Sequence, residues 1–181
     1  VGLKVLPSEH AGDQRFVSRF FQEAKVVNAI RHPNIVDVFD FVETEDRVAY
    51  VMEYVGGPTL SKVLKQAPLD VHRALNVTEQ LADALSAVHA IGVVHRDLKP
   101  SNILVVDADL SERPSVKITD FGICKVTEPG ISGVETATGM VLGTPSYMAP
   151  EQITCEPVTD KTDVYALGEI LFEMLTGRRL F

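Results

Sequence analysis

The segment His95–Asn102 constrains this chain most strongly, together with the tripeptide Asp120–Gly122 eighteen residues after it. The first reads His-Arg-Asp-Leu-Lys-Pro-Ser-Asn and the second Asp-Phe-Gly, so acidic, basic and amide side chains gather in two short polar turns. Apolar runs at 93–94, 103–106 and 116–118 flank these turns and predict short strands that hold them in place. Carboxylate and amide oxygens suit a hard metal ion, and basic side chains suit phosphate. The pattern therefore indicates a site for phosphate and metal.

Phosphoryl transfer requires this set of residue types. The migrating group is negatively charged throughout, so catalysis consists of holding phosphates, neutralising them with hard cations and aligning a hydroxyl group. Asp120 and Asn102 supply the oxygen ligands that Mg²⁺ prefers. An isolated Asp-Phe-Gly would be an ordinary turn, and its place behind the polar segment is what makes it a candidate functional site.

On these two motifs, the chain resembles the eukaryotic-type (Hanks-type) Ser/Thr protein kinases. Its short connections and its compact run Gly143–Gln152 resemble the bacterial members of that family. The resemblance implies ATP as cofactor, with Mg²⁺ or with Mn²⁺ in its place. It implies that Asp97 orients the proton of the attacking hydroxyl and that Lys99 lies near the transferred phosphate. Asn102 and Asp120 would bind the metal and the nucleotide. The implied activity is transfer of the γ-phosphate of ATP to Ser or Thr hydroxyls of proteins.

The first thirty residues predict a strand followed by an amphipathic helix. Residues 1–6 alternate in polarity, with Lys4 on the face opposite Leu3 and Val5. The helix is expected over 13–30, with an apolar stripe of Phe16, Phe20, Ala24 and Val27. Glu23 falls within this stripe, and a carboxylate on a packing face requires a partner. The resemblance makes that partner Lys4, which would also reach the α- and β-phosphates.

The next segment predicts a hairpin and a connection between two lobes. Its strands are expected over 36–42 and 47–55, separated by a polar turn. By resemblance, the backbone carbonyl and amide groups of Glu53 and Val55 bind the adenine edge. Met52 would guard the pocket behind the adenine, and Leu104 would form the floor beneath it. A helix expected over 71–90 would carry the catalytic segment.

The run Gly143–Glu151 resembles the segment on which the family positions its protein substrate. Its form, Gly-Thr-Pro-Ser-Tyr-Met-Ala-Pro-Glu, together with Lys99, resembles Ser/Thr rather than Tyr kinases. Thr144 would help to position the acceptor hydroxyl and Lys99. Glu151 would pair with an arginine that the family carries in a later helix.

Two predictions concern Arg96, one for its backbone and one for its guanidinium group. A helix is expected over 159–175, and by resemblance its Asp163 anchors the backbone around His95 and Arg96. The stretch around Thr136 and Thr138 is rich in small and hydroxyl residues, which favours phosphorylation. A phosphate there would add about −1.5 to −2 charges and could pair with the Arg96 guanidinium, ordering the segment. The alternative is that both threonines are ordinary polar loop residues.

The expected fold class is α+β: a two-lobed protein kinase-like fold with a small antiparallel β-lobe and a mainly helical large lobe. Residues 1–55 would be the part of the small lobe from the family's third strand to the hinge. Residues 56–181 would be the large lobe up to its central helix. The family's glycine-rich loop would precede Val1 and its C-terminal helices would follow Phe181. We therefore expect a partial kinase domain that has little or no activity alone.

Composition limits the partners of the chain. With 25 acidic and 17 basic residues, the net charge of −8 argues against nucleic acid or an anionic membrane surface. Two cysteines give no disulfide framework or zinc spacing, which is typical of a protein in a reducing cytoplasm. Glu169 and Glu173 interrupt the longest apolar helical stretch, so no membrane contact is expected from this segment. A membrane anchor elsewhere in the full-length protein stays open.

Two other functions remain as alternatives. A nucleotide-binding pseudokinase or scaffold usually lacks one or more of the polar residues that the family uses, and here they are all present: Lys4, Glu23, Asp97, Lys99, Asn102 and Asp120. A small-molecule phosphotransferase would share the catalytic aspartate and the metal ligands, but it would not be expected to carry the Gly143–Glu151 run. The expected partners are therefore protein substrates, with a kinase dimer as the arrangement for trans-autophosphorylation.

Overall fold

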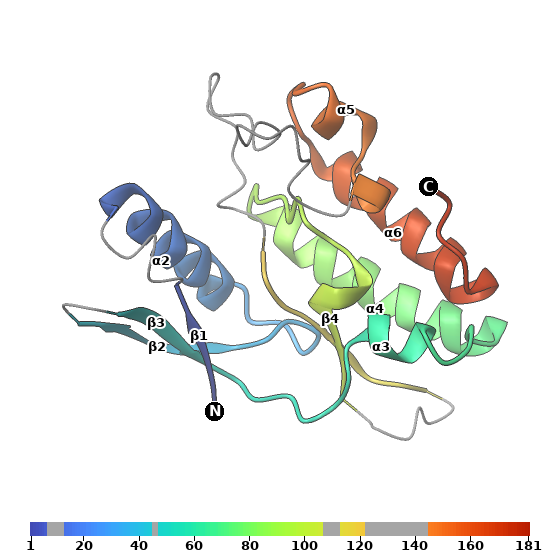
Figure 1. The fold of residues 1–181 in the computed structure, drawn as a ribbon, viewed down its shortest axis with the longest axis horizontal. Coiled ribbons are helices and arrows are strands. Elements are labelled where there is room, and N and C mark those ends of the chain that lie inside the picture. Colours follow the sequence, from blue (N-terminus) through green and yellow to red (C-terminus); the bar gives the residue numbers. More distant parts are fainter. Residues whose placement is uncertain (7–12, 45–46, 107–112, 122–144) are drawn as a thin grey trace.

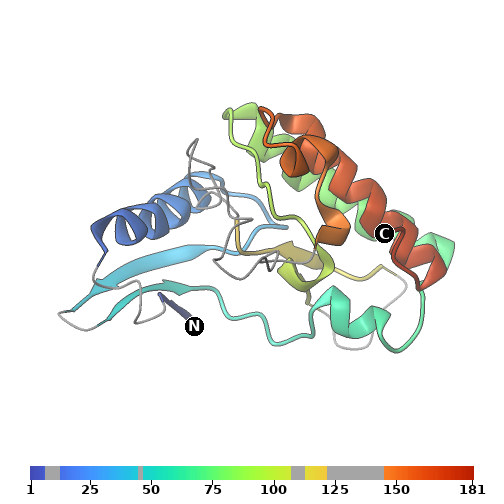
Figure 2. The same ribbon diagram turned by 45° about the horizontal axis from the view of Figure 1, so that its top comes forward.

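The computed structural model describes residues 1–6, 13–44, 47–106, 113–121 and 145–181. A small antiparallel sheet with one helix against it forms the first part of the chain, and a larger helical part follows (Figure 1). The two parts lie at an angle to each other, joined by an extended segment after β3 (Figure 2). This arrangement confirms the predicted two-lobed α+β fold.

The small sheet has the strand order β1-β3-β2. Strand β1 (Gly2–Val5) and strand β2 (Val38–Glu43) pair antiparallel with opposite edges of β3 (Val48–Met52). The hairpin is therefore confirmed, with its turn residues 45–46 outside the described part. Lys4 lies opposite Tyr50 and faces away from Leu3 and Val5, as predicted, and both of these apolar side chains are exposed. From this position, the Lys4 ammonium group reaches the carboxylate of Asp120 in the large lobe.

Helix α2 (Gln14–Ala29) packs against the small sheet and matches the predicted helix closely. Asp13 caps it by accepting a hydrogen bond from the backbone N–H of Arg15. The buried face consists of Val17, Phe20, Ala24 and Val27. The prediction that Phe16 belongs to this face was wrong, because Phe16 is 39% exposed. A helix turns about 100° per residue, so Val17 lies at one edge of the buried arc and Phe16 lies just beyond the opposite edge.

Two long helices pack side by side in the large lobe (Figures 1 and 2). Helix α4 (Val71–Ala90) has the predicted bounds, and helix α6 (Asp160–Thr176) is shifted by one residue at each end. Two short helices, α3 (Leu60–Leu64) and α5 (Pro150–Ile153), accompany them. Within the described residues, no helix is long and apolar enough to cross a bilayer.

A second, two-stranded sheet lies between the lobes and carries the polar turns of the site. Strand β4 (Ile103–Val105) pairs antiparallel with strand β5 (Val116–Ile118), as the apolar runs predicted. The residues at 93–94 are half-buried and form no strand, so the strand predicted there was wrong. The amide of Ile118 donates to the carbonyl of Asn34, whose side chain donates to the Val116 carbonyl. These bonds tie the turn after α2 to the large lobe.

Candidate active site

The segment His95–Asn102, predicted to be catalytic, folds into a compact loop stabilised by its own side chains. Lys99 Nζ lies 2.9 Å from Asp97 Oδ2. The Asn102 side-chain amide donates to the backbone carbonyl of Asp97 at 2.9 Å and to its carboxylate at 3.2 Å. Asn102 ends a 3₁₀ turn, η1 (Pro100–Asn102), directly before β4. The loop therefore presents a half-buried carboxylate between an ammonium group and an amide.

Asp120 joins this loop from the end of β5. The Asn102 amide also approaches the Asp120 carbonyl at 3.4 Å, and Lys4 Nζ lies 2.9 Å from Asp120 Oδ1. The Asp120 backbone has a left-handed conformation (φ 57°), which is uncommon for residues other than glycine, asparagine and aspartate. The structure thus brings Lys4, Asp97, Lys99, Asn102 and Asp120 into one cluster that spans both lobes.

Glu23, the predicted partner of Lys4, belongs to α2, but its side chain lies outside the described part of the structure. The Lys4–Glu23 pair therefore stays a prediction. What the structure shows for Lys4 is the ion pair with Asp120 and an approach of its ammonium group to within 5.5 Å of the Tyr50 ring centroid.

The oxygen atoms of the cluster fit a hard divalent cation. Asn102 uses its N–H groups within the site, and the Ser101 hydroxyl approaches its side-chain oxygen at 3.5 Å. This oxygen has a second lone pair, so it and Oδ2 of Asp120 are the candidate ligands. Among the described residues, no group of three or more His, Cys, Asp or Glu side chains could hold a metal ion. Mg²⁺ usually takes only one or two protein carboxylates and completes its shell with water and phosphate oxygens. The donor set therefore suits a metal that arrives with a nucleotide.

Asp163 holds the backbone of the catalytic segment from α6. Its buried carboxylate accepts hydrogen bonds from the backbone N–H groups of His95 at 2.8 Å and Arg96 at 2.9 Å. The His89 ring contacts the same carboxylate at 2.7 Å. Arg96 has a left-handed backbone (φ 67°), so these bonds stabilise a strained turn directly before Asp97. This is the position that the sequence predicted for Asp163.

His95 is a structural residue whose role sequence reasoning missed. It is fully buried, and its ring packs 4.5 Å from the Phe121 ring. Burial lowers the pKa of His95, which favours the neutral imidazole. Its Nδ1 accepts from the Asp97 N–H at 3.3 Å, so Nε2 carries the proton and faces the Thr119 carbonyl at 3.4 Å. His95 thereby links the catalytic loop to the residues preceding Asp120.

Two contacts hold Glu53 of the predicted hinge in place, one through its backbone and one through its side chain. The Glu53 N–H donates to the Asp37 carbonyl at 2.8 Å. The Glu53 carboxylate lies 2.9 Å from Lys117 Nζ of β5. Val55 and Leu104 are both half-buried. Adenine binding by the backbone carbonyl and amide groups of Glu53 and Val55 stays a prediction, and the structure shows only that the Glu53 N–H is already used within the protein.

Gly57 allows the chain to cross from the hinge to the large lobe. A Cβ atom at this position would lie 1.7 Å from the Val105 carbonyl oxygen, so no side chain fits. Next to it, the Val105 N–H donates to the Pro58 carbonyl at 2.8 Å. The sequence indicated only a turn at Gly56-Gly57, and this close approach could not be predicted.

The run 143–151, predicted to position the substrate, is described only from residue 145 onward. Thr136, Thr138 and Thr144 lie outside the described residues. Glu151, at the start of α5, accepts a hydrogen bond from the Thr162 hydroxyl. Gln152, which the sequence reasoning did not select, donates to the Arg96 carbonyl at 2.8 Å.

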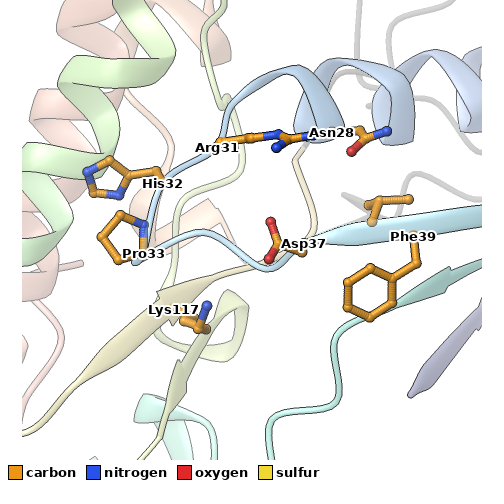
Figure 3. Close-up of a pocket in the computed structure, with 8 residues that line it drawn as sticks. Asn28, Arg31, His32, Pro33, Asp37, Phe39 and Lys117 are labelled. Atoms are coloured by element: carbon orange, nitrogen blue, oxygen red, sulfur yellow. The ribbon is translucent and has the colours of Figure 1, made fainter.

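A cavity among the described residues lies apart from the polar cluster. It has a volume of about 430 Å³ and lies between the end of α2, the start of β2 and β5 (Figure 3). It is lined by Asn28, Arg31, His32, Pro33, Asp37, Val38, Phe39 and Lys117. None of the residues predicted for the site lines it, and its connection to the hinge is the Lys117–Glu53 ion pair. The polar cluster identifies the candidate active site because it carries the reactive groups.

The chain belongs to the protein kinase domain family, whose family model matches residues 1–181. It is 42% identical to the serine/threonine-protein kinase pkn3 of Myxococcus xanthus over 98% of this chain and 33% of that protein. It is 41% identical to the serine/threonine-protein kinase PrkC of Bacillus subtilis over 98% of this chain and 26% of that protein. A protein named serine/threonine-protein kinase PknA, from Mycobacterium tuberculosis, is 43% identical over the whole chain and 42% of its own length. The chain thus spans well under half of these curated bacterial relatives.

Proposed function

We propose that the full-length protein carrying this chain is an ATP- and Mg²⁺-dependent kinase that phosphorylates Ser and Thr hydroxyls of proteins. The observation that best supports this proposal is the convergence of Asp97, Lys99 and Asn102 with Asp120 and the cross-lobe Lys4. The relatives described above carry the name serine/threonine-protein kinase, and the family implies ATP and a divalent metal ion.

Each side chain of the cluster would act at a different point of the transfer. Asp97 would orient the acceptor hydroxyl and take its proton as the new bond to phosphorus forms and the bond to the ADP oxygen breaks. Lys99, 2.9 Å from Asp97, would stabilise negative charge on the transferred group. Lys4 would hold the α- and β-phosphates. Asn102 and Asp120 would bind Mg²⁺, which neutralises phosphate oxygens when bound.

The hinge would hold the adenine through its backbone. The Glu53 carbonyl would accept from the adenine amino group, and the Val55 N–H would donate to the ring. Leu104 would pack beneath the base from β4. The brace from Lys117 to the Glu53 carboxylate supports this assignment, because it keeps the carbonyl of a connecting segment in place.

Regulation and substrate positioning are further parts of the proposal. Thr144 would position the acceptor hydroxyl, and Glu151 would stabilise the platform next to it. Phosphorylation of Thr136 and Thr138 by a second kinase molecule would place charge beside Arg96 and order the segment. This part of the protein would work in the cytoplasm.

The test is phosphate transfer by the full-length protein from γ-labelled ATP to a general protein acceptor, followed by phosphoamino-acid analysis. We expect label on serine and threonine only, and loss of labelling when a chelator removes Mg²⁺. Binding of ATP without transfer would favour the pseudokinase alternative. Label on an aminoglycoside acceptor but not on protein would favour the small-molecule phosphotransferase.

A further inference from the structure

Gln152 joins helix α5 to the peptide bond that precedes Asp97. Its side-chain Nε2 donates to the backbone carbonyl of Arg96 at 2.8 Å. Its Oε1 accepts from the backbone N–H of Ala149 at 3.1 Å. An N–H on one side and a carbonyl on the other allow a single orientation of the amide, so both bonds form together.

The carbonyl of Arg96 and the N–H of Asp97 belong to the same peptide plane. Gln152 holds the oxygen of this plane, and His95 Nδ1 accepts from its N–H at 3.3 Å. The preceding peptide is held by Asp163, which accepts from the Arg96 N–H at 2.9 Å. Each side of the Arg96 residue is therefore fixed by a different helix, α6 through Asp163 and α5 through Gln152.

This double restraint matters because Arg96 has a left-handed backbone (φ 67°). Such a conformation is strained for a non-glycine residue and persists only where its surroundings determine it. Rotation about the Cα–C bond of Arg96 would turn this peptide plane. It would thereby move the Asp97 Cα atom and swing the Asp97 carboxylate. Asp163 restrains the plane before Arg96, so it cannot prevent that rotation by itself.

We propose that Gln152 is a positioning residue that orients Asp97 for proton abstraction. Gln152 also couples this orientation to the segment that leads into α5, through its bond to Ala149. The inference rests on the proposed kinase function. It assigns to Gln152 no contact with substrate or nucleotide. Loss of its bond to Arg96 would lower the rate of transfer and leave the binding of ATP unchanged, because Lys4, Glu53 and Asp120 lie outside the restraint.

Two variants of the full-length protein separate this role from the capping of α5. Gln152→Glu keeps an acceptor for the Ala149 N–H, and Glu is a favoured residue at this position of a helix start. It has no donor for the Arg96 carbonyl. Gln152→Met removes both bonds without adding charge. The same two changes at Gln66, an exposed residue after α3 whose side chain has no described contact, serve as matched controls.

We expect both Gln152 variants to lose about tenfold in kcat, which corresponds to about 1.4 kcal/mol at the transition state. Their KM for ATP should stay within about twofold of the wild-type value, since a tenfold change in affinity would need a further 1.4 kcal/mol. Only Gln152→Met should also unfold at a lower temperature, and the Gln66 variants should match the wild type. A Gln152→Glu protein with wild-type kcat would show that Gln152 only caps α5, and a wild-type kcat in both variants would remove the role altogether. A wild-type protein that transfers no phosphate would instead overturn the proposed function.

Discussion

Asp163→Asn tests whether the buried carboxylate of α6 holds the catalytic segment. The carboxylate is 1% exposed and accepts from two backbone N–H groups, one on each oxygen, as well as contacting His89. An asparagine keeps one acceptor oxygen and turns an NH₂ group toward the other N–H. One buried donor then lacks an acceptor, which costs about 1–3 kcal/mol, and charge-assisted bonds are lost in addition. We therefore expect a loss of about 2–4 kcal/mol in the free energy of unfolding.

For a domain of about this size, each kcal/mol lowers the unfolding temperature by roughly 2–4 °C, so the expected decrease is about 4–16 °C. Differential scanning calorimetry of the full-length protein measures it, and kcat measured at a temperature where the variant is folded should also fall. Asp160→Asn is the matched control, because Asp160 lies in the first turn of the same helix and is exposed. An Asp163→Asn protein that unfolds within 1 °C of the Asp160→Asn protein would refute the reasoning.

Three further predictions concern the hinge and the buried histidine. Gly57→Ala places a Cβ atom 1.7 Å from the Val105 oxygen and should lower the free energy of unfolding by about 1–3 kcal/mol. Gly56→Ala, the control, should leave it unchanged. Equal midpoints of chemical denaturation for the two variants would contradict the close approach. Lys117→Met removes the ion pair with Glu53 and should raise the KM for ATP about fivefold with kcat unchanged. A fivefold change corresponds to about 1 kcal/mol, which is typical of a partly buried ion pair. An unchanged KM would exclude a role of this ion pair in ATP binding. Because burial lowers the pKa of His95, the unfolded chain takes up the proton first, so stability should fall as the pH drops below about 6.5. This fall should be smaller in His95→Phe, and equal slopes would contradict the assignment.

The sequence predicted the elements of the fold where periodicity was long and regular. Helix α4 matches its predicted bounds because six buried positions recur at helical spacing and Asp70 provides a cap. Phe16 was misplaced because spacings of three and four residues show which side of the helix is apolar, but not how far around the helix the buried face extends. The residues at 93–94 form no strand, since a short apolar run has no information about a pairing partner.

The candidate site was predictable where its residues share one motif. The contacts among Asp97, Lys99 and Asn102 are local, so the segment that contains them also positions them. Contacts that cross between elements were not visible in the pattern. The bond from Gln152 to the Arg96 carbonyl, the closeness of Gly57 to Val105 and the ion pair between Lys117 and Glu53 all depend on how distant segments pack.

The most direct test of the proposed chemistry compares Asp97→Asn with Asp120→Asn in the full-length protein. Phosphate transfer from γ-labelled ATP to a protein acceptor is measured together with nucleotide affinity by calorimetry, with and without Mg²⁺. We expect each variant to lose roughly a hundredfold or more in kcat. Asp97→Asn should still bind ATP with the wild-type dependence on Mg²⁺, whereas Asp120→Asn should lose that dependence. Transfer at near the wild-type rate by the Asp97→Asn protein would contradict the account.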